Sequence, residues 1–156
     1  MTETSTVHAV IARALKAHGA DVMFGLLGDA NLFMADAYVR SEGGRFVAAA
    51  HETSAVQMAL GYAAMNGGVG AATVTHGPAV SNCLTALIEG VKAQLPMVLL
   101  AGDTPIVDPE HPQAVDQQAV AAVAGAGFVQ LRSAETVAAD LSMAFRKAEV
   151  ERCPVL

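Results

Sequence analysis

Apolar residues along this chain fall into short continuous runs that are separated by longer stretches with helical spacing. A strand with one solvated face would show apolar and polar residues in alternation, so continuous short runs indicate strands covered on both faces. The predicted strands are residues 22–26, 46–50, 71–75, 97–101 and 128–131. Each run therefore predicts one strand in the interior of a sheet.

The stretches between these runs carry apolar side chains three and four residues apart, the spacing of one helix face. The first helix is expected to begin at the capping residues Thr4, Ser5 and Thr6 and to end at Gly19. The predicted apolar faces comprise Val7, Val10, Ile11, Ala14, Leu15 and His18; Val56, Ala59, Leu60 and Ala63; Leu84, Leu87, Ile88 and Val91; and Val137, Leu141, Ala144, Phe145 and Ala148. Strands alternating with helices predict an α/β fold, a doubly wound parallel sheet flanked by helices.

The length of 156 residues fits one domain, and the chain shows no internal repeat, linker or low-complexity segment. Residues 153–156 have the pattern of a strand that is only beginning, with no cap or polar tail after it. We therefore interpret residues 1–156 as one domain, truncated from a longer protein.

Composition narrows the classes of partner. Nine basic and fifteen acidic residues give a net charge of −6, and no basic stripe is present that could neutralise phosphates, so nucleic acid and anionic membranes are not expected to bind. Neither a signal-peptide pattern nor an apolar segment of membrane-spanning length occurs, and a cytoplasmic protein is expected. Cys83 and Cys153 form no CxxC or metal-ligand spacing, and no metal ligands are predicted.

Candidate chemistry lies in the turns that follow the predicted strands. In open parallel sheets, ligands bind at the carboxyl ends of the strands. The four turns with unusual residues are 25–31, 51–53, 75–78 and 102–105, the last continuing to residue 113. We expect all four to converge on one rim of the sheet.

Glu52 is the main candidate for a catalytic group, because it follows a strand of small apolar residues and opens a helix that is otherwise uncharged and rich in alanine. Position alone also fits a simpler role, in which an acidic residue in the first turn interacts favourably with the helix dipole. The spacing of residues by itself favours that simpler role.

A family resemblance changes the balance. The pattern His51-Glu52, Ala55, Met58-Ala59 and Gly61-Tyr62-Ala63 is similar to the helix that carries the activating glutamate in thiamine-diphosphate-dependent enzymes of the acetolactate synthase, pyruvate oxidase and 2-keto-acid decarboxylase family. Further blocks follow in the family's order: Val22-Met23-Phe24-Gly25 with Gly28; Thr75-His76-Gly77-Pro78 with Asn82; Pro96 through Gly102; and Gln113 with Asp116-Gln117. Nearly the whole chain resembles the family's N-terminal, pyrimidine-binding domain.

The resemblance implies the thiamine-diphosphate-binding fold and assigns roles to residues. Glu52 would hydrogen-bond nitrogen N1′ of the cofactor's aminopyrimidine and activate the cofactor for decarboxylation or carboligation of a 2-keto acid, as in a lyase or transferase. The residues implied in cofactor binding are Leu26, Gly28, Glu52, Thr75, His76 and Asn82, and those implied in substrate binding are His76, His111 and Gln113.

The resemblance also implies what other parts of such an enzyme supply. In the family a separate domain, usually on the partner subunit, holds Mg²⁺ and the diphosphate, and that domain and the central domain are absent from these residues. A homodimer or tetramer is therefore expected, and the isolated chain is expected to be inactive. Flavin (FAD) binding occurs within the family, but nothing in this sequence supports it.

Several alternatives remain open at the level of sequence. His76 and Ala79 replace the Ser and the last Gly of the family's Ser-Gly-Pro-Gly turn, so the resemblance does not identify the keto acid. His76 and His111 also fit solvated loop histidines. The chain could be one subunit of a split decarboxylase acting on sulfopyruvate or phosphonopyruvate, or a noncatalytic assembly or regulatory domain that kept the fold.

Overall fold

The structure is a computed structural model that describes residues 6–156 except residues 106 and 109. Five strands of the described chain form one sheet in the order β2-β1-β3-β4-β5, and every neighbouring pair is parallel. The strands are β1 (Val22–Gly25), β2 (Arg45–Ala48), β3 (Gly70–Val74), β4 (Met97–Ala101) and β5 (Pro154–Val155). The parallel sheet predicted from the alternating pattern is confirmed.

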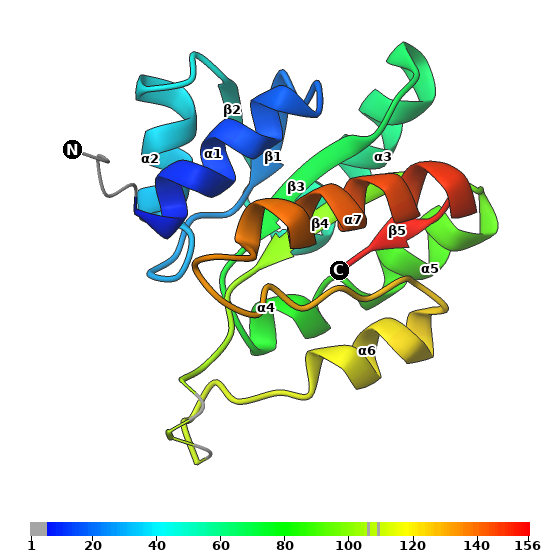
Figure 1. The fold of residues 1–156 in the computed structure, drawn as a ribbon. Coiled ribbons are helices and arrows are strands. Elements are labelled where there is room, and N and C mark those ends of the chain that lie inside the picture. The colour runs from blue at the N-terminus through cyan, green and yellow to red at the C-terminus, as the bar shows by residue number, and fades with distance from the viewer. Residues whose placement is uncertain (1–5, 106, 109) are drawn as a thin grey trace.

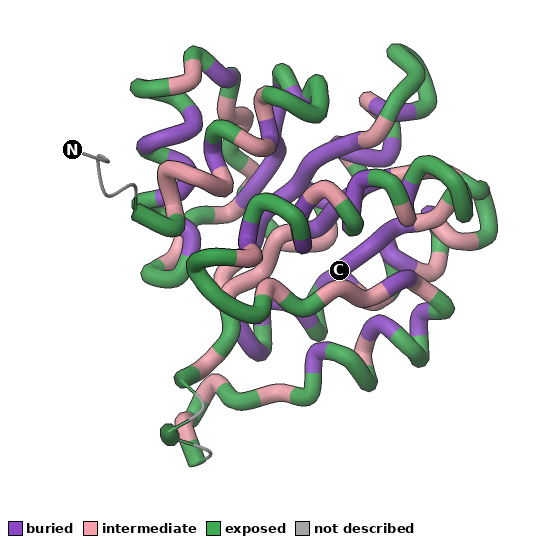
Figure 2. The backbone as a smooth tube through the Cα atoms, in the orientation of Figure 1, coloured by how far each residue is buried: buried purple, intermediate pink, exposed green. Residues whose placement is uncertain are grey.

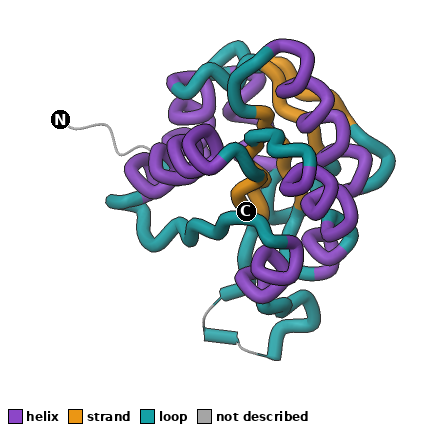
Figure 3. The backbone as a smooth tube through the Cα atoms, turned by 90° about the vertical axis from the view of Figure 1, so that its right-hand side faces the viewer, coloured by secondary structure: helices purple, strands orange, loops and turns teal. Residues whose placement is uncertain are grey.

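Helices cover both faces of this sheet (Figures 1 and 3). On one face, α1 (Val7–Ala17), α2 (Leu32–Arg40) and α7 (Val137–Glu151) pack with one side of the strands in a common apolar cluster. On the other face lie α3 (Glu52–Asn66), α5 (Leu84–Lys92) and α6 (Gln117–Ala124), together with the short α4 (Pro78–Ser81), which begins at the carboxyl end of β3. The α/β fold with a doubly wound sheet flanked by helices is thereby confirmed.

Two predicted helix faces match the burial closely. Every residue of the predicted α7 face is buried, and so are the four predicted for α3, which adds Ala55. Helix α1 begins after Thr6, whose side chain makes no capping hydrogen bond, whereas the predicted caps Thr4 and Ser5 lie outside the described residues. None of the described helices is long and apolar enough to cross a membrane.

Two expectations about strands are wrong. β2 was expected to be buried on both faces, but it is an edge strand with Arg45 and Ala48 exposed, because only β1 pairs with it (Figure 2). Residues 128–131 were expected to form a strand, but only the preceding residue, Gly127, makes an isolated parallel bridge, to Val155 of the short β5. A strand needs a ladder of successive partners, and within residues 128–131 only Val129 makes a backbone hydrogen bond with a described residue, to the Leu156 carbonyl.

The order of the strands determines where the functional site lies. From β1 the chain runs outward to β2 at one edge, and then returns to β3 on the other side of β1 before continuing to β4 and β5. The direction therefore reverses between β1 and β3, and ligands of open α/β sheets bind in the crevice at the carboxyl ends of strands beside such a switch point. Helices α2, α4 and α6 were not predicted from apolar spacing, and α4 lies at this edge.

Candidate functional site

The turns that follow β1 and β3 touch at the switch point. A Cβ atom on Gly28 would lie 2.7 Å from the Cβ of Thr75, so the absence of a side chain allows the two turns to approach this closely. Buried Asn31 holds the first turn in shape: its Oδ1 accepts from the Gly28 amide (2.8 Å) and its Nδ2 donates to the Leu26 carbonyl (3.1 Å). The structure thus brings Leu26, Gly28 and Thr75 together.

His76 follows Thr75 at the same switch point and is only 7% exposed, so the alternative of a solvated turn histidine is wrong for this residue. The Thr75 hydroxyl donates its single proton to Asp29 Oδ1 (3.0 Å) and lies 3.2 Å from His76 Nδ1. With that proton committed, the Thr75 oxygen can only accept from His76 Nδ1. His76 Nδ1 therefore carries a proton. The other ring nitrogen, Nε2, has the lone pair in the neutral ring and the second proton in the charged ring.

Asp29 completes this hydrogen-bond chain as a charged group. Its carboxylate oxygen lies 3.8 Å from His76 Nδ1. The hydrogen bond from Thr75 lowers the pKa of Asp29, with a further contribution from the charge of His76. Through the Thr75 hydroxyl, this carboxylate holds the His76 ring in one orientation. Nothing in the sequence signalled this contact, because 46 residues separate Asp29 from Thr75.

The loop that carries the other two predicted substrate residues packs against the turn after β3. The rings of His76 and His111 have centroids 5.8 Å apart, and the backbone amide of Gln113 donates to His111 Nδ1 (3.2 Å). Gly77 has a φ of 61°, and a Cβ there would lie 1.9 Å from the Gln113 carbonyl oxygen. The structure therefore brings His76, His111 and Gln113 together, and only glycine fits at position 77.

Glu52 is the first residue of α3, at the carboxyl edge beyond β2, and its side chain is 14% exposed. Asn82 Nδ2 donates a hydrogen bond to Glu52 Oε2 (3.0 Å). The other carboxylate oxygen, Oε1, makes no hydrogen bond with any residue that the structure describes. Glu52 therefore presents one fixed oxygen and one available oxygen, next to the positive end of a fifteen-residue helix.

Neighbouring residues fix the start of α3 in place. The His51 side chain caps the helix, its Nδ1 accepting from the Thr53 amide (3.2 Å), and this nitrogen lies 3.9 Å from Glu52 Oε2. The Thr53 hydroxyl donates to the Asn82 carbonyl. Asn82 therefore binds α3 through both its side chain and its backbone, a contact that the spacing of the sequence did not reveal.

The Glu52–Asn82 pair and the His76 group are connected through α4. His76 lies just before Gly77, which precedes α4, and Asn82 is the residue that ends this helix. The four residues of α4 thus separate a half-buried carboxylate from a buried imidazole at the same edge of the sheet.

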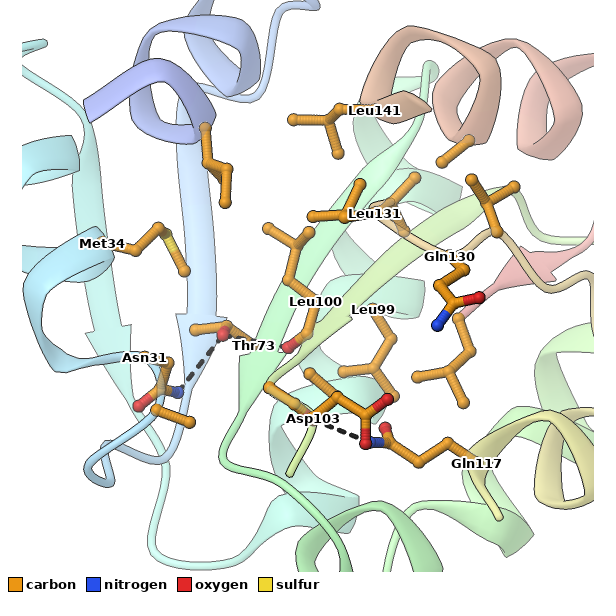
Figure 4. A pocket seen from close by; sticks show the side chains of 18 of the residues that line it. Asn31, Met34, Thr73, Leu99, Leu100, Asp103, Gln117, Gln130, Leu131 and Leu141 are labelled. Atoms are coloured by element: carbon orange, nitrogen blue, oxygen red, sulfur yellow. Dashed lines mark hydrogen bonds between the residues drawn. The ribbon is translucent and has the colours of Figure 1, made fainter. Parts of the chain in front are cut away.

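A cavity of about 270 Å³ lies between β4 and residues 128–131 and extends to Asn31, Met34 and Thr73 (Figure 4). None of the residues predicted for the cofactor or substrate lines it. Hydrogen bonds, burial and strand order locate the chemistry at the switch point instead, so we assign the candidate site there. Within the described residues, no group of three or more His, Cys, Asp or Glu is placed to hold a metal ion.

Several known proteins are similar to this chain in sequence. The chain is 34% identical over 93 residues to the acetolactate synthase large subunit of Haemophilus influenzae, covering 60% of this chain and 16% of that protein. It is 37% identical over 102 residues to acetolactate synthase large subunit IlvG of Mycobacterium tuberculosis, covering 64% and 18%. A sulfoacetaldehyde acetyltransferase of Alcaligenes xylosoxydans xylosoxydans is 34% identical over 88 residues, covering 56% and 14%.

The matched region thus spans less than a fifth of each of these relatives. The family described as "Thiamine pyrophosphate enzyme, N-terminal TPP binding domain" matches residues 5–126, which include the switch-point turns, Glu52 and Asn82. The chain belongs to this family of N-terminal domains of thiamine-pyrophosphate-dependent (thiamine-diphosphate-dependent) enzymes.

Proposed function

We propose that Glu52 binds the aminopyrimidine of thiamine diphosphate at nitrogen N1′ and activates the cofactor for reaction with a 2-keto acid. The observation that carries this proposal is the arrangement of the Glu52 carboxylate, with Oε2 held by Asn82 and Oε1 available at the carboxyl edge of the sheet. A carboxyl oxygen within hydrogen-bond reach of a ring nitrogen can exchange a proton with it. The residues present therefore fit the pyrimidine end of the cofactor.

Asn82 has a positioning role in this proposal. Its amide donates to Oε2, so the proton that Glu52 shares with the ring resides on Oε1. When bound, thiamine diphosphate supplies a carbon nucleophile that adds to the keto carbon of the substrate. The chain's own contribution is to hold the proton at Glu52 Oε1 and to keep that oxygen aimed at one site.

The switch-point residues bind the rest of the pyrimidine and the substrate. Leu26 and Gly28 form the turn after β1, and Thr75, the residue that follows β3, faces that turn. His76 and His111 offer imidazole groups, and Gln113 an amide, to the carboxylate of a 2-keto acid. The Asp29–Thr75–His76 chain orients the His76 ring for this contact.

The reaction class follows from the relatives. Two of the relatives are named as acetolactate synthases and one as an acetyltransferase, so we propose a lyase or transferase that forms or breaks a bond next to a keto carbon. The match spans only 16% of the first relative. We propose that a second domain, on a partner subunit of a homodimer or tetramer, binds Mg²⁺ and the diphosphate.

The Glu52→Gln substitution in the complete enzyme tests this function. We expect kcat for a 2-keto acid such as pyruvate to fall by roughly 10²- to 10⁴-fold, the range for loss of a general acid–base group. The dissociation constant for thiamine diphosphate, measured by isothermal titration calorimetry, should change much less, because glutamine keeps the shape and one hydrogen bond.

Glu89→Gln is the matched control, since Glu89 lies on α5 and its side chain contacts only Gln57 among the hydrogen bonds of the described residues. Its kcat should equal that of the unmodified enzyme. Equal activity of Glu52→Gln and Glu89→Gln would contradict the proposal and favour a noncatalytic assembly domain instead.

A further inference from the structure

The first turn of α3 is capped by a group that can be protonated. His51 is the N-cap residue, and its Nδ1 accepts a hydrogen bond from the Thr53 backbone amide (3.2 Å). N-cap positions are more often held by Ser, Thr, Asp or Asn, whose side-chain oxygens accept throughout the neutral pH range. A histidine nitrogen accepts only while it carries no proton. The cap on α3 therefore requires the neutral imidazole with its proton on Nε2.

Protons from solvent can reach this ring. The His51 side chain is 57% exposed, whereas that of Glu52, the next residue, is 14% exposed. Histidine is the side chain that ordinarily changes charge between pH 5 and pH 8. When Nδ1 gains a proton, it faces the Thr53 amide as a second donor, and the capping hydrogen bond is lost. Acid therefore removes the cap.

The protonated ring has another partner close by. His51 Nδ1 lies 3.9 Å from Glu52 Oε2, about 1 Å beyond the length of a charge-assisted hydrogen bond. Oε2 already accepts from Asn82 Nδ2 (3.0 Å), but a carboxylate oxygen can accept two hydrogen bonds. A small rotation of the ring brings the Nδ1 proton to Oε2. One nitrogen thus serves the helix cap when the ring is neutral and the Glu52 carboxylate when it is charged.

The elements packed against α3 offer the ring no other charged partner. Among the described residues, the one ion pair of His51 is with Glu52. Strands β1, β3 and β4 contain no titratable residue, and neither does α4. Before α5, burial raises the pKa of the Cys83 thiol to about 12, so this thiol is neutral. Glu89 and Lys92 lie further along α5, where Glu89 contacts a later turn of α3. Glu52 is therefore the group that experiences the charge of His51.

We propose that His51 is a positioning residue whose protonation inactivates Glu52 as the pH falls. In the neutral state the cap fixes the first turn of α3, and Asn82 holds Oε2. In the charged state the imidazolium pairs with Oε2 and favours the ionised carboxylate. Glu52 then no longer holds at Oε1 the proton that it shares with the pyrimidine nitrogen. This inference rests on the proposed function of Glu52 and adds an acid limit to it.

NMR of the cofactor-free protein, with ¹⁵N-labelled histidine and threonine, tests the switch itself. We expect the Thr53 backbone amide signal to shift as the pH is lowered from 8 to 5, with the same midpoint as the ring nitrogens of His51. The ring signals also identify the tautomer, because protonated and unprotonated nitrogens differ in chemical shift. In His51→Asn, the amide oxygen takes over as the capping acceptor and does not titrate. The Thr53 signal of this variant should stay constant over the same range.

The pH profile of the complete enzyme tests the consequence for Glu52. Below the midpoint measured for His51, kcat of the unmodified enzyme should fall by about tenfold per pH unit, as expected for one inactivating proton. His51→Asn should shift this acid limb to lower pH, because its cap survives and no charge reaches Glu52. A merely structural effect would scale kcat equally at all pH values. His8→Asn is the matched control, since His8 lies on α1 at the other face of the sheet, and it should keep the limb.

Each other outcome contradicts the proposal. A Thr53 signal that does not follow the His51 ring would show that no switch exists. A signal that follows the ring, with equal pH profiles for the unmodified enzyme and His51→Asn, would show that the switch does not act on Glu52. Failure of the proposed function is distinguishable, because unchanged kcat in Glu52→Gln leaves the NMR result intact. If His51→Asn does not fold, His51→Ser supplies another capping oxygen; if neither folds, position 51 needs more than a neutral cap, and the proposal is overturned.

Discussion

At the scale of single residues, the site depends on polar side chains that meet across long sequence separations. Glu52 and Asn82 are 30 residues apart, and Asp29 and Thr75 are 46 apart, yet each pair is joined by a hydrogen bond of 3.0 Å. The Glu52 side chain, only 14% exposed, needs such a partner, because an unpaired buried polar group costs about 1–3 kcal/mol. The described chain has no buried side-chain nitrogen or oxygen without one.

Cys83 gives a test of the environment behind Glu52. Burial, with a smaller contribution from the charge of Glu52, raises the pKa of the Cys83 thiol to about 12. Because the thiolate is the reactive form, iodoacetamide at pH 8 should leave Cys83 unmodified in the folded protein while it alkylates the half-buried Cys153. Mass spectrometry of proteolytic peptides measures both sites, and alkylation of the two at similar rates would contradict the buried position of Cys83.

At the scale of elements, helices with an apolar stripe of their own were predictable, whereas segments that depend on a distant partner were not. The faces of α3 and α7 follow from spacing within each helix. Residues 128–131 have an equally clear apolar run, but strand formation requires a neighbour, and β5 pairs only as far as Val98 of β4. Short α4 lacks a stripe because it contains only four residues.

The segment that follows residues 128–131 is attached to α7 by a buried carboxylate. Asp140 is 1% exposed, accepts from the Arg132 amide and side-chain Nε (3.0 Å each), and accepts from the Thr136 hydroxyl (2.8 Å). The Arg132 hydrogen bonds, more than any other contact, hold the pKa of Asp140 at about 2, below its ordinary value of 3.8. The ionised form is therefore favoured in the folded state.

The Asp140→Asn substitution should destabilise the protein in a pH-dependent way. A depressed folded-state pKa contributes stability that is fully present above 3.8 and is lost as the pH falls through about 2. The difference in thermal unfolding midpoint between the two proteins should therefore be largest near neutral pH and shrink between pH 4 and pH 2. Asp36→Asn, which removes only an exposed pair with Arg40, is the control and should have little effect. A difference that is independent of pH would contradict the charge-based account.

At the scale of the whole molecule, strand order concentrates the site at one edge. The reversal between β1 and β3 places the turns of residues 26–29 and 75–77 beside each other, and α4 leads from there to Glu52. We propose that these groups bind a pyrimidine and a carboxylate. The resemblance assigns the diphosphate and Mg²⁺ to another domain, so the chain forms one half of the proposed site.

Calorimetry tests this division of the site. We expect the isolated chain to bind thiamine diphosphate in the presence of Mg²⁺ no more tightly than about 1 mM, an affinity of roughly −4 kcal/mol, because it contacts only the pyrimidine end. The complete enzyme, which adds the diphosphate-binding domain, should bind far more tightly. Micromolar binding by the isolated chain would show that residues 1–156 hold the diphosphate themselves and would contradict the proposed division.

The sequence by itself determined the α/β class, the apolar faces of α3 and α7, and, through an ordered set of family motifs, the position of Glu52 at a helix start. These properties are local: helix periodicity and turn residues are readable within a short stretch of chain. Only the tertiary structure decided that Asn82 holds Glu52 and that His76 is buried beside Asp29 and His111. It also decided that residues 128–131 do not form a strand. Those facts depend on which distant segments become neighbours. Parallel pairing joins strands that are far apart in the sequence, so the pattern of residues within one stretch does not show which strands pair.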